Sequence, residues 1–262
     1  MSFLLKWGDE SVRVIPHSEE PDVTSRFDQL FPSVWPKYNS HGDVLQPLWA
    51  GLYEEFPAFQ FVLLNDRTNA LLARGNSVPF TWDGDPDHLP EGIDALAEQA
   101  FAEHRAGREP NTLSAMAAEV PPEHRSQGLG GLLLKAMSGL ATVHGLTSLV
   151  APLRPNRKYR YPLTPIEEYM HWKAADGLPF DPWMRTHAML GAEIMRPAPR
   201  SLRITGTVAE WESWTGMPFP ASGTYVIPDG LATLEIDRES DLGCYWEPNI
   251  WMLHPIKTPN GL

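Results

Sequence analysis

The chain has 262 residues, of which 42% are hydrophobic and 10% aromatic, enough apolar content for one large folded domain or two small ones. Its formal net charge of −12 argues against a nucleic-acid partner, because phosphate binding usually requires a basic surface. A single cysteine, Cys244, excludes an internal disulfide, and we find neither a secretory signal nor an apolar run of roughly 20 residues. We therefore expect a cytoplasmic protein without a membrane partner.

The first third of the chain predicts a strand, two helices and a β-hairpin. Apolar residues at helical spacing follow Asp22, and Pro47 suits the first turn of a second helix. Turn residues 65–69 then separate two strand-like segments. The predicted order is a strand at 12–16, helices at 23–31 and 47–56, and strands at 59–64 and 70–82.

The middle of the chain predicts a βαβ unit. After a break at 83–87, residues 93–105 indicate an exposed helix, which we interpret as an insertion or lid near 84–110. A buried strand at 112–120 is then followed by a proline-rich break, a helix to about residue 144 and a strand at 147–153. This order is typical of a partly parallel sheet.

The remaining segments complete a mixed α/β (α+β) fold. Helices are predicted at 162–172, 182–190 and 208–215, with strands at 201–207, 225–236 and 245–254. No internal repeat or low-complexity linker divides the chain. We therefore predict a core at 1–199 and a strand-rich C-terminal extension at 200–262 that packs on the same domain.

A glycine-rich segment opens the helix of the βαβ unit. Gly128, Gly130 and Gly131 each cost roughly 1 kcal/mol relative to alanine in a helix. Glycines at this position let a ligand approach the free amides and the dipole of the first helical turn, which favour an anion. Arg125 adds donors that suit phosphate oxygens. The segment fits neither the dinucleotide-binding nor the P-loop pattern.

Residues 120–130 match a more specific pattern. The run Val-Pro-Pro-Glu-His-Arg-Ser-Gln-Gly-Leu-Gly resembles the V-x-P-x-x-R-x-x-G-x-G signature of GNAT acyltransferases at every defining position. The order of elements around it is also similar to that fold, in which a mixed, partly parallel sheet is splayed at the cofactor site and flanked by helices. The alternative is a glycine-opened helix packed on a sheet without a ligand.

The resemblance implies a binding site for acetyl-CoA. The strand before the loop would splay at a bulge, here near Ala118–Val120, and its exposed backbone would pair with the pantetheine arm. The amide of Val120 would polarise the thioester carbonyl, and the loop amides would hold the pyrophosphate. The implied cofactor-binding residues are Ala118, Val120, Arg125, Ser126, Gln127, Gly128, Leu129, Gly130 and Gly131.

The resemblance also suggests catalytic residues. His187 stands four residues before Gly191, where many family members place a tyrosine acid, and a near-neutral pKa suits proton transfer. The alternative is a helix-end histidine with a structural hydrogen bond. The glutamate base of some members is replaced by Ala115, so Glu119 is our candidate base, with an exposed strand-end carboxylate as the alternative.

The expected reaction is direct transfer of an acetyl group from acetyl-CoA to an amine of a small molecule. Two alternatives remain open: another donor, such as a longer acyl-CoA or a carrier thioester, and a non-catalytic acyl-CoA sensor. The basic run 154–160 indicates either a local patch or a solvated loop. Histidine and cysteine spacing predicts no metal site, the tryptophan content suits an aromatic amine, and a homodimer is left open.

Overall fold

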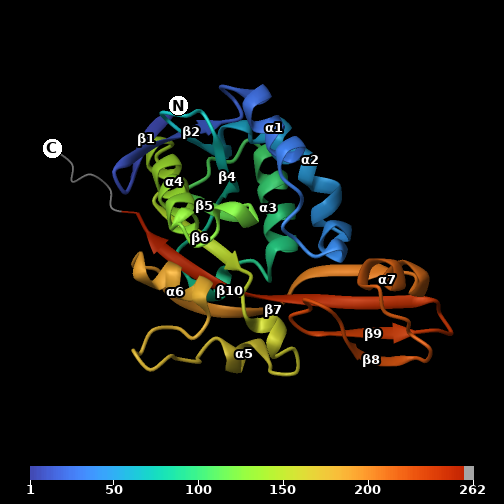
Figure 1. Ribbon diagram of the computed structural model, residues 1–262. Coiled ribbons are helices and arrows are strands. Elements are labelled where there is room, and N and C mark those ends of the chain that lie inside the picture. Colours follow the sequence, from blue (N-terminus) through green and yellow to red (C-terminus); the bar gives the residue numbers. More distant parts are fainter. Residues whose placement is uncertain (257–262) are drawn as a thin grey trace.

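The protein, described by a computed structural model over residues 1–256, is built on one ten-stranded sheet (Figure 1). The strands are β1 (Phe3–Trp7), β2 (Glu10–Pro16), β3 (Gln60–Asn65), β4 (Leu71–Phe80), β5 (Thr112–Glu119), β6 (Ser148–Leu153), β7 (Glu193–Gly206), β8 (Gly223–Val226), β9 (Thr233–Asp237) and β10 (Leu242–Pro255). The α-helices are α1 (Pro21–Leu30), α2 (Leu45–Glu55), α3 (Ile93–Arg105), α4 (Leu129–Val143), α5 (Ile166–Tyr169), α6 (Pro182–Met189) and α7 (Val208–Thr215).

The sheet is mixed, as the sequence predicts. Its strands follow the order β1-β2-β3-β4-β5-β6-β10-β9-β8, and β7 pairs with β10 outside this path. Within residues 1–256, β5 and β6 form the one parallel pair, joined by the crossover helix α4. The predicted βαβ unit is thus confirmed.

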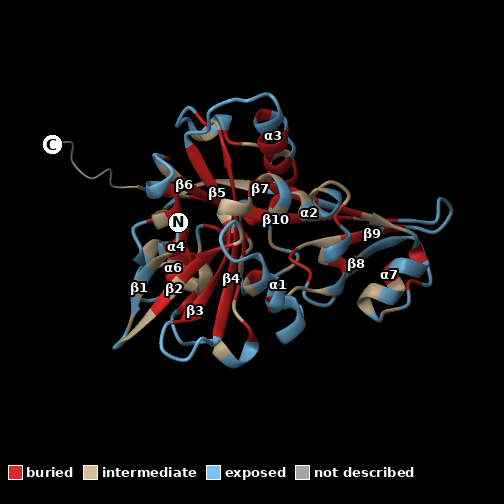
Figure 2. Cartoon of the chain, turned by 90° about the horizontal axis from the view of Figure 1, so that it is seen from above, coloured by how far each residue is buried: buried red, intermediate tan, exposed pale blue. Residues whose placement is uncertain are grey.

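Helices cover both faces of this sheet. Alternate residues of β3 point to opposite faces: Leu63 packs in the apolar cluster under α4, and Val62 packs in the cluster under α1. Helices α1, α2 and α3 lie together on the side away from α4 (Figure 1). Figure 2 shows the strands between these layers as the most deeply buried part of the chain.

Helix α3 belongs to the core, so the exposed helix predicted for this segment is wrong. Its apolar residues recur at helical spacing, and Leu96, Ala97 and Phe101 are buried against α2 and β4. The N-terminus of α3 is fixed by Asp94, whose side chain accepts a hydrogen bond from the Arg203 N–H at 2.8 Å. This packing does not suit a mobile lid.

The long strands β7 and β10 carry an inserted lobe, which we define as residues 207–241. The C-terminal half of β10 pairs with β6, and its N-terminal end pairs with β9 of the lobe. The lobe shares the core of the domain through Trp211, which is fully buried. The predicted division between residues 199 and 200 falls inside β7, and residues 257–262 lie outside the described part of the chain.

Further elements differ from the prediction. The strand predicted at 225–236 is divided into β8 and β9, and the strand predicted at 201–207 begins earlier, at Glu193 of β7. The N-terminal strand β1 was not expected, and it pairs with β2 through a turn at Gly8 that has a φ of 59°. The helix predicted at 162–172 is confined to α5. Among residues 1–256, no helix combines the length and the apolar character that crossing a membrane requires.

Candidate active site

The two parallel strands separate before either of them ends. Their paired residues stop at Ser114 and Val150, although β5 continues to Glu119 and β6 to Leu153. A bulge at Met116, which has no partner in β4, bends β5 just beyond this point. The backbone of β5 after Ser114 therefore has a paired strand on one side only, and an extended ligand can pair with such an edge.

Ala118 and Val120 both lie beyond this separation. Each is partly exposed, and the Val120 N–H donates to no backbone acceptor in the described part of the chain. The separation begins at Ser114, which is earlier than the expected position. The open edge is therefore longer than the sequence suggested.

The loop after β5 presents a run of free backbone donors. The first helical hydrogen bond of α4 joins the Leu132 N–H to the Gly128 carbonyl, so the six amides from Ser126 to Gly131 have no backbone acceptor within residues 1–256. Ser126 and Gly128 have φ values of 63° and 80°, and left-handed residues of this kind let successive N–H groups converge on an anion. Arg125 and the loop up to Gly128 are exposed.

The three glycines of this loop have different structural reasons. Gly128 is required by its positive φ. Packing does not require it, because the space around it is open. Gly130 is required by packing, since a Cβ there would lie 2.8 Å from Cζ3 of Trp183 on α6. At Gly131 a Cβ would make ordinary contacts of 3.8 Å. Close approach of a ligand therefore explains fewer of these glycines than the sequence suggested.

Strand β1 supports the loop from the N-terminal end of the chain. The Trp7 indole N–H donates to the Gln127 carbonyl at 2.8 Å. The Phe3 ring packs over Gly139 in α4, where a Cβ would lie 2.7 Å from the ring. The turn from loop to helix is thus held by residues more than a hundred positions away in sequence.

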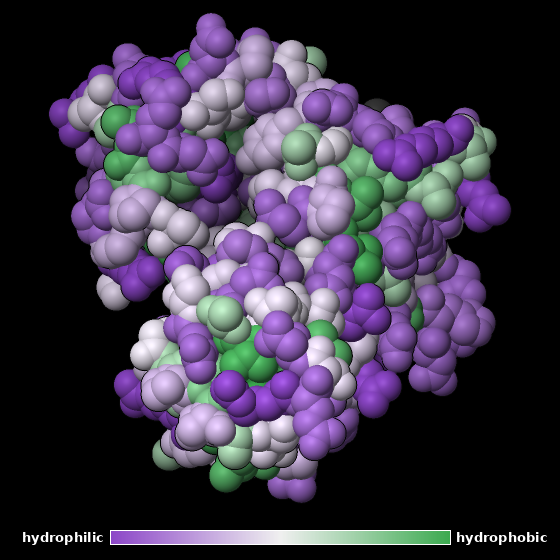
Figure 3. Space-filling model, turned by 90° about the vertical axis from the view of Figure 1, so that its right-hand side faces the viewer, coloured by the Kyte–Doolittle hydropathy of each residue, from purple (hydrophilic) through white to green (hydrophobic). Residues whose placement is uncertain are grey.

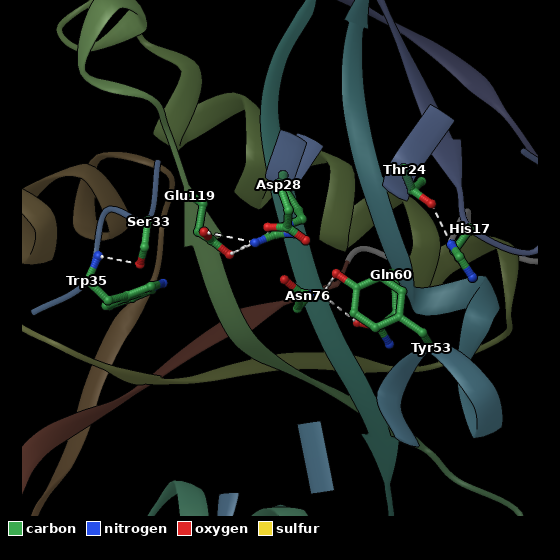
Figure 4. A network of polar contacts seen from close by, with 10 residues as sticks. His17, Thr24, Asp28, Ser33, Trp35, Tyr53, Gln60, Asn76 and Glu119 are labelled. Atoms are coloured by element: carbon green, nitrogen blue, oxygen red, sulfur yellow. Dashed lines mark hydrogen bonds and ion pairs between the residues drawn. The ribbon is translucent and has the colours of Figure 1, made fainter. Parts of the chain in front are cut away.

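Glu119 is buried, so the exposed carboxylate considered from the sequence is wrong. Its side chain lies under the α1 face of the sheet, and Trp35 and Asp28 lie on either side of it (Figure 4). The Arg74 guanidinium donates to both Glu119 oxygens at 3.0 and 3.1 Å and pairs with Asp28 at 2.7 Å. Burial raises the pKa of the Glu119 carboxyl, and the charge of Arg74 opposes this shift.

His187 is buried between α6 and β10, with 1% of its surface exposed. Its Nδ1 lies 2.8 Å from Nε2 of His254, and its own Nε2 has no partner within residues 1–256. The ring also meets the edge of Trp183, the residue that packs on Gly130 of the loop. Burial lowers the pKa of His187 well below its ordinary value, and His254 adds to this shift.

The candidate acid and base therefore lie on opposite faces of the sheet. Glu119 lies on the face covered by α1, whereas His187 belongs to α6, which packs against α4 on the other face. A reaction that removes a proton on one side and adds one on the other suits this placement.

Comparison with known proteins identifies the family. Arginine N-acetyltransferase avaD of Aspergillus versicolor is 33% identical over 266 residues, which cover 90% of this chain and 91% of that protein. The loading GNATL domain of CurA from Lyngbya majuscula has a TM-score of 0.60 at 17% identity, covering 94% of this chain and 98% of that one. The GphF GNAT-like decarboxylase in complex with isobutyryl-CoA has a TM-score of 0.53 at 16% identity, covering 98% of this chain and 100% of that one. No family model matches the sequence.

The chain belongs to the GNAT superfamily.

It is therefore an acyltransferase of the N-acetyltransferase type. The GNAT resemblance that residues 120–130 carry is confirmed, because the relative matches over 90% of the chain.

The sequence did not reveal a polar network beside the bulge of this GNAT fold. Asn76 lies opposite Ala117 in β5, and its amide donates to the Tyr53 hydroxyl at 2.9 Å and to Gln60 at 3.1 Å (Figure 4). The Asn76 carbonyl oxygen is buried without a partner in residues 1–256. These residues lie on the same face as Glu119, which makes that face polar beside the separated strands.

Two of the four cations of the basic run 154–160 are held in the fold, and the other two, Arg157 and Arg160, are exposed as the solvated-loop alternative expects. Arg154 is largely buried and pairs with Glu247 of β10 at 2.9 Å. Lys158 is buried, and its ammonium donates to the carbonyls of Tyr161 and Leu231 at 2.7 Å, while burial lowers its pKa to about 8. The run therefore joins the end of β6 to the inserted lobe.

Asp181 fixes α6 relative to this run. Its carboxylate accepts hydrogen bonds from the amides of Asn156 and Arg157 at 3.1 and 2.7 Å, and it caps α6 through the amide of Trp183 at 2.9 Å. The Tyr169 hydroxyl donates to the same carboxylate at 2.9 Å. One buried side chain thereby positions the helix that carries His187.

Proposed function

We propose that this GNAT enzyme transfers an acetyl group from acetyl-CoA to an amine of a small molecule. The observation that carries the proposal is the run of six free amides from Ser126 to Gly131, placed directly after the open edge of β5. A diphosphate needs such donors, and an extended pantetheine arm needs such an edge.

The residues present fit coenzyme A along its length. The amides of Ser126, Gln127, Gly128, Leu129, Gly130 and Gly131 would hold the diphosphate, with Arg125 as a cation at its edge. The backbone at Ala118 would pair with the pantetheine, and the Val120 N–H would donate to the thioester carbonyl oxygen. One oxyanion donor of this kind lowers a barrier by roughly 2.7 to 4 kcal/mol. Coenzyme A supplies an activated acyl group with a thiolate as the leaving group.

We infer that the acceptor approaches from the α1 face. Glu119 and Asp28 lie there, and a basic amine suits these carboxylates in a protein of net charge −12. The relative from Aspergillus versicolor is named for arginine, which is a basic small molecule. Three of the aromatic residues that favoured an aromatic acceptor, Tyr38, Tyr169 and Trp251, are buried in the core.

Glu119 remains the proposed base, acting directly or through water. The raised pKa of a buried carboxyl makes its carboxylate a stronger proton acceptor, and Arg74 keeps it ionised. His187 remains the proposed acid, because its free Nε2 is buried next to the residue that packs on the loop.

Release of free thiol from acetyl-CoA tests the function directly. We expect turnover with arginine or another basic amine, and less with an aromatic amine of equal concentration. Parallel assays with longer acyl-CoA donors test the donor. Calorimetric binding of acetyl-CoA without turnover for any amine would instead indicate a sensor, and the catalytic proposal would fail.

A variant of the loop tests the cofactor site. Arg125→Gln removes a charged donor, and hydrogen bonds to charged groups contribute about 1.5–3 kcal/mol, so the Kd for acetyl-CoA should rise by about tenfold or more. The matched control is Arg108→Gln. Arg108 is also exposed, but it precedes the start of β5, whereas Arg125 follows the end of that strand. Equal affinities in the two variants would refute the assignment of Arg125.

A further inference from the structure

His187 and His254 are 67 positions apart in the sequence, yet their rings form one buried pair. Nε2 of His254 lies 2.8 Å from Nδ1 of His187, with the ring centroids 4.9 Å apart. Their exposed fractions are 1% for His187 and 5% for His254. Both members of the pair are therefore buried, and His254 is the more exposed of the two.

The inner nitrogen of the pair is unexplained by the fold. Nε2 of His187 is buried and has no partner in the described residues, and leaving a buried polar atom unpaired destabilises the fold. Orphaned groups of this kind need a specific reason, and a substrate group is one such reason. Trp183 contacts both His187 and the loop glycine Gly130, so one aromatic side chain links the histidine to the start of α4.

We propose that His254 is a second functional histidine, which relays a proton from solvent to His187 and from there to the leaving thiolate. The proposal rests on the function proposed above. His254 does not touch substrate in this scheme and acts as a positioning residue. A His254 Nε2–H that donates to Nδ1 of His187 leaves the His187 proton on Nε2, the nitrogen that has no partner.

The proton transfers balance without a charged histidine at rest. As the bond between acyl carbon and sulfur breaks, the thiolate takes the proton from Nε2 of His187. Nδ1 of His187 then takes the proton from Nε2 of His254, and Nδ1 of His254 takes one from water. One proton has moved from solvent to sulfur, and both rings are neutral but carry their proton on Nδ1. Before the next turnover each ring must exchange this proton for one on Nε2, which returns the pair to its starting tautomers. The proton of the acceptor amine leaves separately on the α1 face.

The surroundings of the pair favour a neutral relay over a permanently charged acid. Burial lowers the pKa of His254 to about 4 and the pKa of His187 well below its ordinary value. No carboxylate among residues 1–256 pairs with either ring, and the aromatic rings that His187 meets on α6 and β10 are those of Trp183 and His254. A single histidine in this site would have no proton to replace the one it donates.

Two variants of His254 test the relay. In His254→Gln the side-chain amide keeps a donor for Nδ1 of His187 but cannot pass a proton, so kcat should fall by about tenfold to 10²-fold while the Kd for coenzyme A stays unchanged. His254→Ala should regain turnover with added imidazole and not with 1-methylimidazole, which has no N–H. His171→Gln, an exposed change, is the matched control and should behave as wild type.

Nitrogen-15 NMR of the ligand-free protein gives a measurement that does not depend on activity. At pH 7 we expect two neutral rings, with the His187 proton on Nε2 and a shared hydrogen bond between the rings. A doubly protonated His187, or wild-type kcat in His254→Gln, would overturn the relay. Absence of thiol release by the wild type would instead show that the proposed function is wrong, so the two failures can be told apart.

Discussion

The two strands that separate at the active site are each held by an arginine–glutamate pair. At the end of β5, Glu119 pairs with Arg74 of β4; just after β6, Arg154 pairs with Glu247 of β10. Among the described residues, no strand pairing joins β5 to β6 beyond Ser114 and Val150. We call the unpaired ends of these strands the β5 arm and the β6 arm, and each arm depends on contacts with its outer neighbour. The opening between the arms thus follows from the pairing of each strand with its outer neighbour.

The two pairs differ in their surroundings. Arg74 has a second partner, Asp28, whose side chain is 71% exposed, so the β5 pair reaches solvent beneath α1. Arg154 also donates to the Asp229 carbonyl of the inserted lobe, and Glu247 accepts from Asn39. The β6 pair therefore has further partners in the lobe and in Asn39, whereas the further partner of the β5 pair is the exposed side chain of Asp28, which water can replace.

Seen from the side of the inserted lobe, the surface is hollowed between the upper and lower parts of the molecule (Figure 3). The lobe forms part of this side of the protein, and Arg154 and Lys158 fix it through the carbonyls of Asp229 and Leu231. Loss of these contacts should therefore change the shape of the surface as well as the stability of the fold.

The largest expected effect is in the β6 arm. Glu247→Ala leaves Arg154 buried without its carboxylate, and removing one partner of a buried pair costs about 3–5 kcal/mol. Urea unfolding followed by circular dichroism measures this loss. A loss below about 1 kcal/mol would show that Arg154 finds another partner or water, and that the two arms do not differ as described.

The free energy of unfolding should also depend on pH through β10, which carries His254 opposite Leu149 of β6. The pKa of His254 is lowered to about 4 in the folded protein, so the unfolded chain binds this proton first as the pH falls. The free energy of unfolding should decrease between pH 6.5 and pH 4, by about 3 kcal/mol from this residue. Unfolding curves of wild type and His254→Gln across this range should converge toward pH 4, and parallel curves would contradict the assignment.

A smaller effect is expected in the β5 arm. In Glu119→Ala, Arg74 keeps its contact with Asp28 and can reach water, so we expect a loss of about 2 kcal/mol, less than for Glu247→Ala. Activity should fall more than stability, because Glu119 is also the proposed base. Glu119→Gln separates the structural role from the role as base, because the amide keeps an acceptor oxygen for Arg74 but cannot take up a proton. An unchanged kcat in that variant would exclude Glu119 as a base.

The smallest effect is expected from Asp28→Asn. Exposed ion pairs contribute about 0–1 kcal/mol, and the free energy of unfolding should change within that range. A loss as large as that of Glu119→Ala would mean that the β5 arm is as closed to solvent as the β6 arm.

The parts of this site that could be predicted from the sequence are those built from neighbouring residues. The loop from Arg125 to Gly131 and the helix after it depend on local backbone geometry, so their residue types and spacing indicated both the fold and the anion site. The exposed helix predicted at 93–105 was wrong, because only tertiary packing decides whether an amphipathic helix lies at the surface.

Contacts between distant residues had no local signal. Trp7 supports Gln127, and Arg74 pairs with Glu119 from the neighbouring strand. His187 was found through its position in the family pattern, but its partner His254 lies in a strand that sequence patterns placed in the C-terminal extension. Such partners follow from the sheet order β6-β10-β7, which cannot be derived from the periodicity of any one strand.

The central claim is that the free amides of Ser126–Gly131 bind a diphosphate. Titration calorimetry of the wild-type protein with coenzyme A and, separately, with pantetheine tests it most directly, because pantetheine keeps the arm and the thiol but lacks the diphosphate. We predict heat of binding with coenzyme A and at least a tenfold weaker interaction with pantetheine, consistent with about 1.4 kcal/mol or more from the loop. Equal affinity for the two compounds, or no binding of coenzyme A, would contradict the account.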